Sequence, residues 1–258
     1  MKLLIIGFAA FAMALTTLSA ADVDPLQANS DNLRAAVDGK KGAAEIKRLA
    51  VLVLTEAKKE EGPAAADADK ENHDARVKYA QGVAEYAEYA LYSASVGAPA
   101  ATATDMIATL EAQSPKSKYL TEDAYLVVAN AALSAQQADR ASQFAKKALT
   151  APKGAKPELA DSTAHYIVGV VAANKKELPV ADKELRAALS GIKGVPAMEG
   201  PALYFLGEAD YTLGRQGMDR TQADQGIKFM LQSALISGQY QSAAGAEARR
   251  MKTEMGEK

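Results

Sequence analysis

The side chains best suited to chemistry are few and far apart in the sequence. The chain has two histidines, His73 and His165, and neither stands at metal-ligand spacing from the other or from a dense acidic cluster. His73 lies in an Asn-His-Asp run beside an acidic segment, which predicts a solvated residue at the start of a helix. His165 lies in an apolar stretch, which predicts packing against a neighbouring helix. We therefore predict no metal site and no cofactor.

Motifs for nucleotide binding and hydrolysis are also missing. There is no Gly-x-Ser-x-Gly elbow, no glycine loop followed by Lys-Ser/Thr and no dinucleotide fingerprint, and the Gly-Lys-Lys-Gly run at 39–42 is too short for a phosphate loop. The best candidate acid is Glu208, between Gly207 and Ala209 on an otherwise apolar segment. A buried glutamate there would suit the general acid of a peptidoglycan-cleaving enzyme of the cell envelope. The alternative interpretation is a solvated residue that faces a groove.

Tyrosines concentrate on one segment, a predicted helix over residues 71–96. Tyr79 and Tyr86 fall on the apolar stripe of this helix, and Tyr89 and Tyr92 flank it. A tyrosine ring buries like phenylalanine while its hydroxyl reaches solvent or a carbonyl, so we expect core packing for most of these side chains. Tyr89 and Tyr92 are the candidates for stacking against a ligand.

The elements that position these residues are best seen over residues 161–189, which are typical of a helical hairpin. An apolar run over 166–171 ends at Asn-Lys-Lys, and a second helix begins at Pro179, whose fixed φ and missing N–H suit a first turn. Ala181, Leu185 and Ala188 then form one buried stripe. Small residues, including Gly169, allow the two backbones to approach closely. The pattern therefore predicts an antiparallel helix pair.

The same spacing of small and large residues recurs along the chain. Forty residues earlier, alanines stand at the positions equivalent to those of the hairpin, and later residues repeat the spacing of four and three. The later copy has nineteen residues between its first two positions instead of twelve, which predicts a seven-residue insertion in a loop over 216–222. A fainter pair is expected between 79–95 and 104–112. The two full copies consist of Ala129, Ala141, Ala145 and Ala148, and of Gly207, Gly226, Met230 and Ser233.

These residues resemble the tetratricopeptide repeat family. Leu206-Gly207-x-Ala209-x-Tyr211-x-x-Gly214 is similar to the first-helix half of its motif, and the hairpin of 161–189 resembles its framework of small, small, large and small residues. The spacing here is longer and less regular than the family period of about 34 residues, and alanines replace its usual tyrosine. The resemblance covers residues 123–236 and implies an all-α fold of antiparallel helix pairs stacked as an αα-superhelix, a solenoid. The alternative is an irregular α-helical bundle.

The resemblance also implies a function. In this family the first helix of each pair lines a concave surface that holds a peptide or a partner helix. The lysine pair that clamps a C-terminal carboxylate is missing, so an internal or apolar segment is the expected ligand. We expect an exported, non-catalytic scaffold that binds another protein. An envelope enzyme or small-ligand binder that uses Glu208, and a purely structural envelope component, are the alternatives. The positions that correspond to the concave surface are Leu126, Asn130, Leu133, Tyr166, Val170, Asn174, Tyr204, Glu208 and Tyr211.

Residues 1–21 are typical of a secretory signal peptide. Lys2 is the only charge before Asp22, an apolar run follows it, and Ser19 and Ala21 are small residues suited to cleavage ahead of Asp22. The alternative is an uncleaved anchor, because the uncharged run approaches the ~20 residues that span a bilayer. We expect a periplasmic or secreted protein with no membrane span after cleavage.

The composition excludes several kinds of site and disfavours one class of partner. The sequence has no cysteine, which excludes disulfides, thiolate zinc sites, cysteine nucleophiles and lipidated cysteine. The net charge of −2 does not favour nucleic acid as a partner. Stability must therefore come from packing.

The chain divides into three predicted parts: a signal peptide (1–21), N-terminal helices with a linker (22–69) and a repeat domain (70–258) that ends in a capping helix over 241–258. Helices are expected over 24–37, with a cap among Asn29, Ser30 and Asp31, and over 43–60. Residues 62–69 are a linker, and Thr121 is expected to cap a helix. Turns are expected at 97–99, 114–117, 151–154 and 191–201, and no alternating strand pattern occurs.

Overall fold

The computed structural model describes residues 24–62 and 70–256. The predicted signal peptide and all but the first residue of the predicted linker lie outside these ranges. The described residues are helical apart from turns and short loops, and they contain no strand. The prediction of an all-α protein is therefore confirmed for this part of the chain.

The described residues form eleven helices, and the expected helix over 43–60 has those bounds. The bounds are α1 (Pro25–Asp38), α2 (Ala43–Glu60), α3 (Lys70–Ser95), α4 (Ala100–Gln113), α5 (Glu122–Ser134), α6 (Ala138–Thr150), α7 (Pro157–Asn174), α8 (Leu178–Ile192), α9 (Pro196–Gly217), α10 (Arg220–Leu235) and α11 (Gln241–Glu254).

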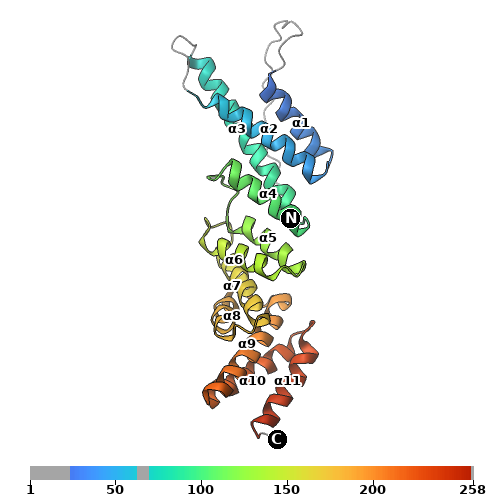
Figure 1. Ribbon diagram of the computed structural model, residues 1–258, viewed down its shortest axis with the longest axis vertical. Helices are drawn as coiled ribbons and strands as arrows, with labels where there is room; N and C mark the ends of the chain where they lie inside the picture. Colours follow the sequence, from blue (N-terminus) through green and yellow to red (C-terminus); the bar gives the residue numbers. More distant parts are fainter. Residues whose placement is uncertain (1–23, 63–69, 257–258) are drawn as a thin grey trace.

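The helices follow one another along the long axis of the molecule, from α1–α3 at one end to α10 and α11 at the other (Figure 1). Among the described residues each helix contacts only helices one or two places away in the sequence. The most extensive contacts lie within the pairs α9–α10 and α7–α8. The structure thus consists of helices packed in adjacent pairs, in which each pair is covered by its neighbours.

The same type of turn connects the two helices in four of these pairs. A residue in the left-handed region ends the first helix: Lys40 (φ 50°), Gln136 (φ 59°), Lys176 (φ 61°) and Met218 (φ 56°). The N–H of the following residue then donates to the carbonyl five residues earlier, as from Gln137 to Ala132 and from Glu177 to Ala172. The turns at Gln136 and Lys176 are forty residues apart, the same offset that separates the repeated sequence patterns.

Small residues permit close backbone contact inside the pairs, as the sequence predicts. A Cβ atom at Gly226 would lie 2.5 Å from the backbone nitrogen of Tyr211 and 2.7 Å from the carbonyl oxygen of Gly207. A Cβ atom at Gly169 would lie 2.6 Å from Cγ of Leu185. These positions therefore admit no side chain unless the two helices move apart.

The predicted loop insertion over 216–222 is wrong. Helix α9 continues to Gly217 and α10 begins at Arg220, so the extra residues lengthen both helices by about one turn each. The longer helices remain in contact, because a Cβ atom at Gly214 would lie 2.4 Å from the backbone nitrogen of Ala223. Gly214 thus extends the close contact of the pair.

Two other local predictions are also wrong. Pro201 lies inside α9, which begins at Pro196, and not in a turn. The carbonyl that lacks a donor because of Pro201 belongs to Ala197, which is exposed and can bind water.

The N-cap of α1 is Asp24, whose carboxylate accepts the N–H of Leu26 at 3.0 Å. The residues expected to cap it, 29–31, lie within the helix because Pro25 already suits a first turn.

The close contact in α9–α10 leads to a first prediction. Gly226→Ala should destabilise the protein by about 2–4 kcal/mol, because the new methyl group meets backbone atoms that cannot rotate away. Gly82→Ala on the exposed side of α3 is the matched control, since a Cβ atom there meets nothing within 4 Å. The control should stabilise by up to about 1 kcal/mol because alanine favours the helix. Urea unfolding of both variants measures the difference, and equal stabilities would contradict this account.

Candidate functional site

An open groove runs along α5 where three first helices of successive pairs meet. It consists of two adjoining cavities of about 690 Å³ and 440 Å³, which share Val127 and Asn130 in their linings. We call it the α5 groove. The larger cavity lies between α5 and the turn from α3 to α4, over residues 97–100. The smaller one lies between the end of α3, the outer side of α5 and the start of α7.

The walls of the α5 groove are mainly apolar. Val96 is 55% exposed and Leu159 is 39% exposed, although both are large aliphatic residues. Leu126 and Tyr92 line the same cavity at less exposed positions. Apolar side chains exposed together in a concave surface are typical of a binding site, because a ligand that covers them removes their surface from water.

Asn130 supplies the polar group at the centre of the groove. Its side chain is exposed between the two cavities and makes no hydrogen bond or ion pair within the described chain. The amide has two donors and an acceptor, so it can pair with both the N–H and the C=O of a peptide. Asp123 and Lys156, of opposite charge, stand at the edge of the smaller cavity.

A buried carboxylate fixes one wall of the groove. Glu122 is fully buried at the first position of α5, and its Oε1 accepts the N–H of Gly154 at 3.0 Å. The Nζ atom of Lys153 lies 3.3 Å from Oε2, and the N–H of Glu122 donates to the carbonyl of Pro152. These contacts hold the α6–α7 loop beside α5, and Leu159 follows on α7. Its place in the first turn of α5 is also favourable for an acid, because the helix dipole is positive there.

The structure brings only part of the predicted surface together. Leu126 and Asn130 line the α5 groove, whereas Leu133 packs half-buried against the core. Val170 is buried, and Asn174 is exposed at the end of α7. Tyr166 is half-buried and packs against both neighbouring hydrophobic clusters.

The predicted residues on α9 have partners within the chain. The Tyr204 ring lies 4.8 Å from the ring of Tyr240 between centroids. Tyr211 is buried, and its hydroxyl donates to Oε2 of Glu254 on α11 at 2.7 Å. Burial and its contact with Glu254 raise the pKa of the Tyr211 hydroxyl. Tyr211, on α9, is thus covered by α11 and does not face the groove.

Glu208 is not the buried acid of this structure. Its side chain is 33% exposed and its Oε1 lies 2.7 Å from Nζ of Lys176. The buried acid on α9 is Asp210, two residues later, which Arg186 contacts at 2.5 Å and Gln222 at 3.3 Å. Burial raises the pKa of the Asp210 carboxyl although Arg186 opposes the shift. Arg186 also binds Asp182 at 2.6 Å, so one guanidinium connects two carboxylates.

The histidines have the surroundings of structural residues. Nδ1 of His165 lies 2.6 Å from Oε2 of Glu184 on α8, so this residue packs against the neighbouring helix as predicted. His73 is half-buried near the start of α3. Residues 24–62 and 70–256 contain no group of three or more histidine and acidic side chains arranged to hold a metal ion.

The tyrosines of α3 form an aromatic surface that leads towards the groove. Tyr89 is 43% exposed and its ring lies 5.7 Å from that of Tyr119 between centroids. The ring of Tyr119 in turn stacks on Tyr92 at 6.0 Å, and Tyr92 lines the groove. Tyr119 comes from the α4–α5 loop and was not anticipated, because no periodic pattern places a loop residue on a distant helix.

No protein-family model, curated protein or solved structure matches this chain. None of the helices in the described part of the chain has the length and apolar composition that crossing a membrane requires. The function must therefore be argued from the residues themselves.

The wall of the groove gives a second prediction. Glu122→Gln should weaken the attachment of the α6–α7 loop and destabilise the protein by about 1–3 kcal/mol, because a charged hydrogen-bond acceptor is lost. Hydrogen exchange should accelerate at the amide of Gly154. Glu158→Gln, at an exposed position of α7, removes the same charge and should leave the exchange rate of the Gly154 amide unchanged. Unchanged exchange in Glu122→Gln would contradict the role of this carboxylate.

A third prediction concerns alkaline pH. Burial raises the pKa of Tyr166 to about 12, against about 10 in an unfolded chain. The stability that depends on its neutral form is therefore complete below pH 10 and is lost as pH rises towards about 12. Tyr166→Phe should lose less unfolding free energy than the wild type over this interval, measured by urea unfolding at each pH. Parallel losses in the two proteins would refute the prediction.

Proposed function

We propose that this protein is an exported, non-catalytic scaffold of the tetratricopeptide-repeat type, with helix pairs stacked as a superhelix, and that it binds a segment of another protein in the α5 groove. The forty-residue offset of the shared turns supports the repeat assignment. So does the restriction of contacts to helices one or two places apart. Residues 1–21 support export to the periplasm or out of the cell.

The observation that carries the proposal is the α5 groove itself. First helices of three successive pairs supply its walls, two aliphatic side chains are exposed in it, and the amide of Asn130 has no partner within the described chain. An apolar segment buries the aliphatic surface, while the amide pairs with the backbone of the same segment. The charges of Asp123 and Lys156 balance one another, which favours a segment without strong net charge.

The enzymatic alternative receives less support. Glu208 is ion-paired with Lys176 and partly exposed, which removes the desolvation that a general acid near neutral pH requires. Asp210 is buried but bound by Arg186, and none of the cavities described above is lined by it. We therefore propose the scaffold function and assign no catalytic residue.

Selection from a random peptide library, followed by affinity measurement, tests the proposal. Val96→Glu combined with Leu159→Glu should weaken the selected peptides at least about tenfold, because charges replace the apolar surface that a ligand covers. Leu235→Glu is the matched control, since Leu235 is 83% exposed on α10 and lies outside the groove. Peptides that bind all variants equally would place the binding surface elsewhere and reject the groove.

A further inference from the structure

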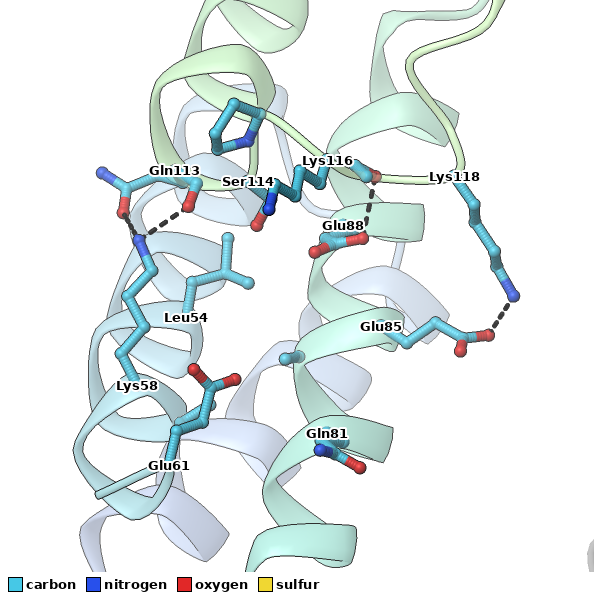
Figure 2. Close-up of a pocket in the computed structure, with 14 residues that line it drawn as sticks. Leu54, Lys58, Glu61, Gln81, Glu85, Glu88, Gln113, Ser114, Lys116 and Lys118 are labelled. Carbon is cyan, nitrogen blue, oxygen red and sulfur yellow. Dashed lines mark hydrogen bonds and ion pairs between the residues drawn. The ribbon is translucent and has the colours of Figure 1, made fainter. Parts of the chain in front are cut away.

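A second cavity, separate from the α5 groove, lies between α2, α3 and the α4–α5 loop. Its volume is about 470 Å³, within the range of small-ligand sites. Leu54, Ala57 and Ala84 form an apolar floor, and the first two of these side chains are almost fully buried. Apart from Pro115, the other lining residues are polar or charged, unlike most of those in the groove. We call it the α2–α3 cavity (Figure 2).

Most charged side chains that line the α2–α3 cavity already have partners within the protein. Nζ of Lys58 donates to the carbonyl oxygen of Gln113 at 2.6 Å, and Lys118 pairs with Glu85. The hydroxyl of Ser117 donates to Oε2 of Glu88 at 2.8 Å. The contact of Lys58 joins α2 to the end of α4, and the other two attach the α4–α5 loop to α3.

Two opposite charges remain without a partner. Glu61, at the end of α2, and Lys116, on the α4–α5 loop, make no hydrogen bond or ion pair within the described chain. Figure 2 shows Glu61 at one end of the cavity and Lys116 at the other, with the apolar floor represented by Leu54 between α2 and α3. The site thus offers a carboxylate at one end and an ammonium group at the other.

We propose that the α2–α3 cavity binds a short peptide with both termini free. Its ammonium group pairs with Glu61, its carboxylate pairs with Lys116, and its small side chains lie on the apolar floor. A simple anion would leave Glu61 unpaired, and a simple cation would leave Lys116 unpaired. A single amino acid places its two charges on one carbon, whereas these two side chains stand at opposite ends of the cavity.

Other polar groups of the lining suit the amides of a peptide. Gln81 supplies an amide without a partner in the described chain, and Ser114 supplies a hydroxyl. One carboxylate oxygen of Glu88 accepts the hydroxyl of Ser117, so its other oxygen can accept a peptide N–H. The cavity thus combines hydrogen-bonding groups with apolar surface, as a peptide with small side chains requires.

Calorimetric titration of the full chain with tri-alanine tests this proposal. Three capped forms accompany it: N-acetylated, C-amidated, and capped at both ends. Each cap should weaken binding about fivefold, the effect of one partly exposed ion pair. The doubly capped peptide should bind most weakly. Tri-alanine that does not bind, or that binds no better than the doubly capped form, would overturn the proposal.

Two variants assign the termini. In Glu61→Gln the N-acetyl cap should no longer weaken binding, while the C-amide still does. Lys116→Gln should show the opposite pattern. Glu158→Gln and Lys183→Gln, at exposed positions on α7 and α8, match these charge changes and should retain both cap effects. Both cap effects persisting in Glu61→Gln and Lys116→Gln would also overturn the proposal. Because Val96 and Leu159 do not line this cavity, their variants should leave tri-alanine binding unchanged.

Discussion

The structure depends on direct backbone contact between the two helices of a pair. In α9–α10 this contact is made by Gly207, Gly214 and Gly226, each of which faces backbone atoms of the partner helix. Contact at this distance buries both helices along their length without a large central core. That arrangement suits a chain rich in alanine and lacking tryptophan and cysteine. Each added pair then needs only its neighbours for burial, which explains the elongated order of the helices (Figure 1).

Polar side chains fix how one part of the chain sits against the next. Arg186 on α8 reaches the buried carboxylate of Asp210 on α9, and the hydroxyl of Ser233 donates to the carbonyl of Gly200 at 2.8 Å. Glu122 attaches the α6–α7 loop to the start of α5. Such buried groups stabilise only one relative position, because any other leaves them without partners. The contacts of Glu122 hold the α6–α7 loop at the wall of the α5 groove.

The protein presents two surfaces of different chemistry. The α5 groove is apolar, with one free amide at Asn130, and suits a segment of another protein. The α2–α3 cavity has charged ends at Glu61 and Lys116 and suits a small ligand with both charges. Neither surface contains Asp210, the buried acid of α9, which pairs with Arg186. Binding is the activity that we propose for both surfaces.

The sequence by itself determined the helices, the close pairing at Gly169 and Gly226, and the placement of Leu126 and Asn130 on one helical face. These features follow from local periodicity, from proline at helix starts and from the size of single residues. It did not determine that the residues after Gly214 would extend two helices, because a loop and two longer helices preserve the same spacing. Nor did it determine which face a neighbour covers. Tyr211 lies on a helical face like that of the groove residues, yet α11, thirty residues later, encloses it. Leu159 and Val96 line one cavity only when α3, α5 and α7 pack together, and that depends on contacts between residues distant in the sequence.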